Sequence, residues 1–189
     1  MTSLPSQSST SRIRPASVEN RPPFEPAITP ITVLGVGNLI MGDDGIGLAL
    51  LERLEAERPD ERITFVDGAT GGMELLPVVQ EATRLLILDA VAGKEPGKVV
   101  SFSGDQVPRL LATKLSPHQV GLLDLFAASR MLGTEPAQVE VVGVVPQVVD
   151  LGLELSAPVT AAIDEALRQA RAVLDRWLAE LDESTEADE

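Results

Sequence analysis

A β-branched stretch in this chain is followed at once by a glycine-rich loop and then by a helical pattern. Ile31–Leu34 predicts a strand, and Gly35–Gly47 reads Gly-Val-Gly-Asn-Leu-Ile-Met-Gly-Asp-Asp-Gly-Ile-Gly. Strand, glycine loop and helix in this order are typical of a phosphate-binding loop, and two of the glycines have its spacing. Asp43 and Asp44 stand where such a loop carries lysine and serine or threonine. These carboxylates indicate a loop that attracts metal cations instead of phosphate.

Strand and helix patterns alternate along the rest of the chain. Strands are expected over Ile31–Val36, Ile63–Val66, Arg84–Asp89, Lys98–Phe102 and Val139–Val145, and helices over Gly45–Arg58, Met73–Gln80, Pro117–Leu132 and Pro158–Leu181. Leu85–Leu88 is a continuous apolar run, which is typical of a strand buried on both faces. The short strand Lys98–Phe102 is expected at an edge. The alternation predicts an α/β fold, a three-layer sandwich with a mostly parallel central sheet of about five strands.

The predicted domain spans residues 30–181, between two segments of different composition. Residues 1–29 are rich in serine, threonine and proline, and residues 182–189 are acidic. Both segments are predicted to be disordered, as an N-terminal extension and a C-terminal tail. No apolar run approaches the roughly 18 residues of a membrane span, and the N-terminus lacks a signal-peptide pattern. A cytoplasmic protein without membrane contact is expected.

Composition narrows the possible functions. The 189 residues carry 29 acidic and 15 basic side chains, a formal net charge of −14, which disfavours binding to nucleic acid. The chain has no cysteine, which excludes disulfides, a thiolate nucleophile and zinc–thiolate sites. Its one histidine is His118, so any mechanism that needs an imidazole must use that residue.

The predicted topology gathers several candidate ligands. In open α/β sheets, ligands bind beyond the carboxyl ends of the strands. Asp44 follows the first predicted strand, Asp67 ends the second and Asp89 ends the third. His118 falls in the first turn of a predicted helix, for which Ser116 is the expected N-cap. Two carboxylates and an imidazole suit a borderline divalent ion such as zinc, nickel, manganese or iron, so Asp44, Asp89 and His118 form a candidate metal site.

Each of these residues also has an ordinary structural interpretation. Asp44 is a candidate helix cap, and Asp89 is a candidate turn residue. Asp67 and Gly68 form a common turn pair, and His118 could be an ordinary residue in the first turn of a helix. A nucleotide-binding α/β protein is a further alternative, because Asp67 matches the ribose-binding acid of that fold. The dinucleotide fingerprint itself lacks its third glycine.

Five segments carry a more specific signal across Ile31–Leu181. They are Gly35–Gly47, Asp67–Leu76, Leu88–Ala90, Ser116–Leu122 and Val142–Pro146. In this order they resemble the motifs of the endopeptidases that mature the large subunit of [NiFe] hydrogenases. The Ser-Pro-His-Gln form around His118 is similar to the branch that serves uptake-type hydrogenases.

The resemblance implies an endopeptidase that removes the C-terminal extension of the hydrogenase large-subunit precursor after nickel insertion. It implies that Asp44, Asp89 and His118 contact the metal and act in catalysis. The nickel would be carried by the precursor, and no nucleotide cofactor is expected. The resemblance also makes Asp67 and Gly68 candidates for substrate recognition. A non-catalytic module that docks at the nickel site, or acts as a chaperone with the same three ligands, is the alternative at this point.

Overall fold

The computed structural model describes residues 29–104 and 117–187, and the side chains of residues 117–120, 123 and 187 are outside this description. Strands and helices alternate through these ranges. The strands are β1 (Thr29–Val36), β2 (Ile63–Ala69), β3 (Ala82–Ala90), β4 (Val99–Ser103) and β5 (Gln138–Val144). The helices are η2 (Gly42–Gly45), α1 (Ile46–Glu57), η3 (Met73–Leu75), α2 (Leu76–Glu81), α4 (Pro117–Leu132) and α5 (Ala157–Ala187), where η marks a 3₁₀ helix.

The strands form one five-stranded sheet in the order β2-β1-β3-β5-β4. β1 pairs in parallel with both β2 and β3, and β3 pairs in parallel with β5. β4 lies at the edge and runs antiparallel to β5. The predicted mostly parallel sheet and the edge position of β4 are therefore confirmed. The carboxyl ends of the parallel strands β1, β2, β3 and β5 lie along one side of the sheet, which is called here the carboxyl edge.

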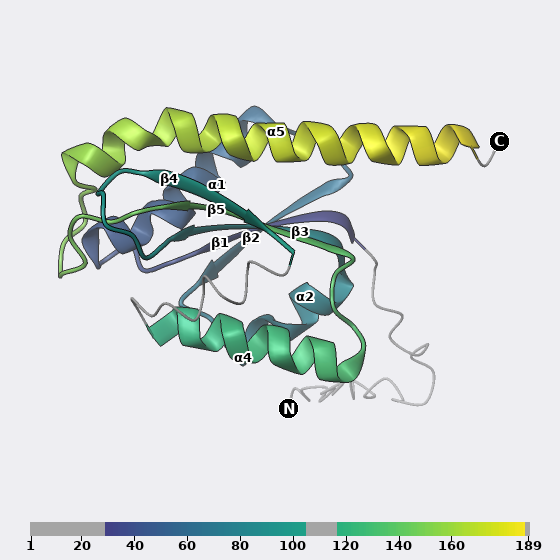
Figure 1. The fold of residues 1–189 in the computed structure, drawn as a ribbon, viewed down its shortest axis with the longest axis horizontal. Helices are drawn as coiled ribbons and strands as arrows, with labels where there is room; N and C mark the ends of the chain where they lie inside the picture. Colours follow the sequence, from purple (N-terminus) through teal and green to yellow (C-terminus); the bar gives the residue numbers. More distant parts are fainter. Residues whose placement is uncertain (1–28, 105–116, 188–189) are drawn as a thin grey trace, which may run out of the picture.

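Helices cover both faces of the sheet and complete three layers (Figure 1). One core cluster joins α1 and α5 to the sheet, and the other joins α2 and α4 to the opposite face. In β3 the side chains of Leu86 and Leu88 belong to the first cluster, while Leu85 and Ile87 belong to the second. All four are fully buried, as the continuous apolar run predicts. None of the helices in the described ranges is both long and apolar enough to cross a membrane.

Several element boundaries differ from the predicted ones. The single helix expected over Met73–Gln80 is divided into η3 and α2, with Pro77 in the first turn of α2. A proline has no N–H to continue the hydrogen-bond ladder, which accounts for the division. β1 begins at Thr29, the last residue of the predicted extension. The remainder of that extension lies outside the described residues.

Helix α5 is longer than its apolar pattern indicates. The pattern predicts an end at Leu181, but the helix continues to Ala187. Asp182, the first residue of the predicted disordered tail, accepts a hydrogen bond from Arg62 at 2.5 Å. Asp182–Ala187 are therefore helical in the structure, where the sequence predicts a disordered tail, and a contact with a distant loop accompanies the continued helix. Residues 188 and 189 lie outside the described part.

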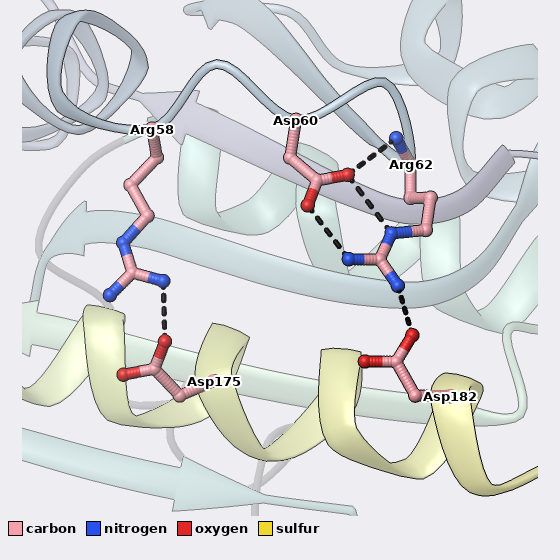
Figure 2. A network of polar contacts seen from close by, with 5 residues as sticks. All are labelled: Arg58, Asp60, Arg62, Asp175 and Asp182. Carbon is pink, nitrogen blue, oxygen red and sulfur yellow. Dashed lines mark hydrogen bonds and ion pairs between the residues drawn. The ribbon is translucent and has the colours of Figure 1, made fainter.

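A polar network joins the loop between α1 and β2 to helix α5 (Figure 2). Arg58 pairs with Asp175, and Arg62 donates to both Asp60 and Asp182. The Arg62 guanidinium donates to Asp60 through Nε at 3.0 Å and Nη2 at 2.9 Å, and its backbone N–H adds a third bond at 2.9 Å. These bonds lower the pKa of Asp60 to about 2.

We expect Asp60 to contribute to stability above its unfolded pKa and to lose that contribution in acid. Its folded pKa of about 2 lies below the ordinary value of 3.8, so the unfolded state binds more protons between these values and is favoured as the pH falls. After allowance for solvent screening, Asp60→Asn should lower the free energy of unfolding by about 1 kcal/mol at neutral pH. Urea unfolding should show the difference shrinking towards pH 2; a constant difference would contradict the assignment.

Candidate functional site

The glycine loop folds back on itself at the end of β1. Gly37 has a φ of 138°, and a Cβ atom at this position would lie 1.9 Å from the carbonyl oxygen of Asp44. Only glycine fits there, because any side chain would occupy the space of the Asp44 backbone. Gly37 therefore lets the turn that carries Asp44 lie directly over the end of the first strand.

Gly47 brings the same turn against β3. A Cβ atom on Gly47 would lie 2.2 Å from the carbonyl oxygen of Val36 and 2.3 Å from that of Leu88. The first turn of α1 thus rests on the last residues of both strands, and η2, which contains Asp44, packs against β3. Asp89 follows Leu88 in β3. Close backbone packing at a single glycine therefore places Asp44 and Asp89 at the same part of the carboxyl edge.

Both of these carboxylates are buried. Asp44 is 4% exposed and Asp89 is fully buried. Asp89 pairs with Gly143 inside the sheet and accepts a hydrogen bond from the Ala90 N–H at 2.8 Å. Asp89 is therefore a strand residue, and the alternative interpretation as a turn residue does not apply. Gly45, not Asp44, holds the N-cap position of α1. Aspartate is rarely buried to this degree, so two such residues at a ligand-binding edge single out this region as the candidate site.

Asp67 lies at an irregularity in β2 and is exposed. Gly35 pairs with Asp67 and Val36 with Ala69, so Gly68 is an extra residue in the strand. The Asp67 carboxylate accepts a hydrogen bond from the Ala69 N–H at 2.9 Å, as in an Asx-turn. Ala69 has a φ of 42°, a conformation that glycine adopts more easily. The local turn interpretation of Asp67 therefore holds, whereas its role in substrate recognition stays a prediction.

The start of α4 packs against the loop that follows β2. α4 begins at Pro117, as predicted, so His118 lies in its first turn. One turn later, a Cβ atom on Gly121 would lie 3.1 Å from Cα of Gly72. This close approach holds the N-terminal end of α4 beside the β2 loop. The His118 side chain and the expected N-cap Ser116 lie outside the described residues.

Asp43, the first of the two adjacent aspartates in the glycine loop, has a structural role. This side chain is fully buried. It accepts hydrogen bonds from the backbone N–H groups of Gln147, Val148 and Ser156 at 2.8, 2.9 and 2.6 Å, and from the Ser156 hydroxyl at 2.8 Å. Burial raises the pKa of Asp43, but these bonds outweigh burial and hold it below its usual value. Asp43 thus anchors the loop between β5 and α5.

The geometry of the glycine loop argues against the phosphate-binding alternative. A phosphate loop uses backbone N–H groups that point at the ligand. Here the N–H groups of Gly37, Ile40, Met41, Gly42, Asp43 and Asp44 all donate to oxygen atoms of the protein itself. The loop also contains no lysine or arginine. Its amides therefore hold the protein together at the place where a nucleotide-binding protein would present them to phosphate.

The predicted three-residue metal site remains a prediction. Among the side chains that the structure describes, no group of three histidine, cysteine, aspartate or glutamate residues is arranged to hold a metal ion. The predicted site includes His118, whose side chain is not among them. The structure brings Asp44 and Asp89 together and places the first turn of α4 beside the β2 loop.

Comparisons with known proteins identify the family. A family model described as "Hydrogenase maturation protease" matches residues 48–173. The hydrogenase 2 maturation protease of Escherichia coli is 39% identical over 148 residues, which cover 76% of this chain and 90% of that protein. The hydrogenase expression/formation protein HupD of Rhodobacter capsulatus is 35% identical over 158 residues, or 80% of this chain and 75% of that protein.

Solved structures agree with the sequence matches. The hydrogenase maturating endopeptidase HybD from E. coli superposes with a TM-score of 0.74 at 37% identity, covering 78% of this chain and 93% of that one. The [NiFe] hydrogenase maturation protease HybD from Thermococcus kodakarensis gives a TM-score of 0.63 at 28% identity, with 76% and 98% covered. With its α/β sandwich and its buried aspartates at the carboxyl edge, the chain belongs to the hydrogenase maturation protease family and is a peptidase.

Proposed function

We propose that this protein is the endopeptidase that removes the C-terminal extension from the large-subunit precursor of a [NiFe] hydrogenase once nickel has been inserted. The family and the names of its relatives support this class of substrate. The observation that carries the proposal is the pair of buried carboxylates, Asp44 and Asp89, that Gly47 brings together at the carboxyl edge. Carboxylate oxygens are ligands that divalent cations accept, so a cation delivered by the substrate is the ligand that this pair favours.

Asp44, Asp89 and His118 recognise the nickel centre of the precursor in this proposal. Two carboxylates and one imidazole are ligands that a borderline divalent ion accepts. The first turn of a helix disfavours imidazolium, and the neutral imidazole is the form that binds metal, so this position suits a histidine ligand. The metal belongs to the substrate, and its presence reports that the precursor has been assembled before the extension is removed.

The hydrolytic step follows from this arrangement. The bound ion fixes the scissile segment and polarises its carbonyl group or an attacking water. One of the two carboxylates acts as general base and takes a proton from the water as its oxygen adds to the carbonyl carbon. The C–N bond then breaks, and the proton passes to the leaving amine. Asp67 and Gly68, at the irregularity in β2, contact the substrate beside this site.

The test is a cleavage assay with purified protein and nickel-loaded precursor, read by intact mass. The wild-type protein should shorten the nickel-loaded precursor and leave the metal-free precursor intact. His118→Ala should lower the cleavage rate at least about a hundredfold while its circular dichroism spectrum matches wild type. Cleavage by His118→Ala at the wild-type rate would overturn the proposed recognition. A precursor that binds but keeps its length with wild-type protein would instead indicate a docking or chaperone module.

A further inference from the structure

Exposed apolar side chains gather on two loops beside the candidate site. Nine large apolar residues are exposed in the described part of the chain, and six of them lie on these loops. The six are Leu39 and Ile40, after β1, and Val148, Val149, Leu151 and Leu153, after β5. Together they are called the apolar surface. Exposed apolar residues scattered singly are ordinary, but a cluster of this kind marks an interaction site.

Backbone hydrogen bonds join the two loops into one unit. Gly152 donates to the carbonyl oxygen of Ile40 at 3.0 Å, and its own carbonyl oxygen accepts from Gly42 at 2.8 Å. Met41 and Gly152 form a parallel bridge, so Ile40 lies next to Leu151. Gly42 has a φ of 59°, and a Cβ atom there would lie 3.2 Å from the carbonyl oxygen of Val148. Backbone pairing therefore holds the two loops of the apolar surface side by side.

The apolar surface is also fixed to the residue next to Asp44. The Asp43 carboxylate holds both ends of the exposed segment, through Gln147 and Val148 at one end and Ser156 at the other. Just before Ser156, Leu155 packs against the core. The surface and the candidate catalytic carboxylate thus belong to one hydrogen-bonded region of the carboxyl edge.

The charges of these loops indicate what they bind. Residues 38–41 and 146–156 contain no lysine or arginine, and their only charged side chains are Asp150 and Glu154. Both acids are exposed. An apolar surface with acidic residues beside it is complementary to an apolar segment that carries a basic side chain. A peptidase must hold its polypeptide substrate along the surface beside its active site, and the apolar surface adjoins the turn that carries Asp44.

We infer that the apolar surface binds an apolar segment of the precursor polypeptide that carries a basic side chain. The inference rests on the proposed function, because it takes the substrate from that proposal. It assigns to the two loops a contact with polypeptide that is separate from recognition of nickel by Asp44, Asp89 and His118. Loss of this contact should therefore weaken substrate binding and leave the chemical step unchanged.

The test is a pair of matched double variants assayed on nickel-loaded precursor. Leu151→Ser combined with Leu153→Ser removes two side chains that are 79% and 80% exposed. This variant should raise KM about tenfold, with kcat within about twofold of wild type. The control combines Met131→Ser with Leu132→Ser, 87% and 60% exposed. That pair is at the opposite end of α4 from His118, and KM should stay at the wild-type value.

A binding measurement gives a readout that does not need cleavage. Titration of the nickel-loaded precursor into Asp44→Asn protein should show Kd rising about tenfold when Leu151→Ser and Leu153→Ser are added. Glu154→Gln should raise KM about threefold at low ionic strength and have no effect at high salt. A KM for Glu154→Gln equal to that of wild type at low salt would remove the basic side chain from the inference.

The two proposals fail in different ways. If the wild-type protein leaves the precursor uncut, the proposed function is wrong. If the wild-type protein cleaves and the Leu151→Ser, Leu153→Ser variant has the same KM and Kd as the control, only the apolar contact is wrong. Sedimentation that shows a wild-type dimer, lost in this variant while KM is unchanged, would assign the surface to a second copy of the chain and overturn the inference.

Discussion

Replacement of Asp44 by asparagine should reduce cleavage of nickel-loaded precursor about a thousandfold. Asparagine keeps the size of the side chain but removes the negative charge, and with it both a metal ligand and a candidate general base. Asp44 is 4% exposed, and asparagine has nearly the same shape and volume, so the substitution leaves no cavity in the buried site. The free energy of unfolding should therefore stay within about 1 kcal/mol of wild type. Single-turnover cleavage rates and urea unfolding measure the two effects.

Asp44→Glu is the matched variant for this prediction. Glutamate lengthens the side chain by one methylene and restores the carboxylate, so its cleavage rate should lie well above that of Asp44→Asn. Equal rates for the two variants would show that charge at this position is not what cleavage requires. A rate for Asp44→Asn close to wild type would remove Asp44 from the site and leave Asp89 and His118 to be assigned anew.

The sequence predicted the layers of this fold because its apolar residues follow the two periodicities that distinguish strands from helices. Leu85–Leu88 is buried on both faces, as a central parallel strand requires, and Ile46, Leu50 and Leu54 form one fully buried helical stripe. The short strand β4 is at the edge, as expected. These features depend on neighbouring residues in the chain, so a single sequence is sufficient to find them.

Features that depend on residues far apart in the chain could not be predicted from local patterns. The end of α5 is accompanied by the bond between Arg62 and Asp182, which are 120 residues apart. Asp43 bonds to Gln147 and Ser156, which follow it by 104 and 113 residues. No local pattern in the sequence shows such pairs. The glycine loop contains two adjacent aspartates, but no residue near them in the sequence indicates which carboxylate is the anchor.

The candidate site could be predicted from the sequence only in part. The rule that ligands bind at the carboxyl ends of strands correctly placed Asp44 and Asp89 at one edge. Their closeness depends on Gly47, which packs within van der Waals distance of two strand ends, and periodicity does not reveal that contact. Gly121 plays the corresponding part for the start of α4, where His118 lies.

Replacement of Asp43 by alanine should cause a large loss of stability, whereas Asp44→Asn should mainly slow cleavage. The variant would leave four hydrogen-bond donors without their acceptor, three from backbone N–H groups and one from the Ser156 hydroxyl. At about 1 kcal/mol for each bond, partly recovered by water, the free energy of unfolding should fall by about 3 kcal/mol. Thermal unfolding should show a Tm lower by roughly 10 °C.

The contribution of Asp43 should also depend on pH. Its folded pKa lies below 3.8, so the stabilisation is present above that value and is lost as the pH falls through the folded pKa. Asp43→Asn keeps one oxygen but turns an NH₂ group towards N–H donors, so it should be nearly as damaging to stability as Asp43→Ala.

Well below its Tm, Asp43→Ala should in addition raise KM for the precursor, because the loop that carries Leu151 and Leu153 loses its anchor. A stable Asp43→Ala protein with the wild-type KM would show that the loop is held in place without this carboxylate.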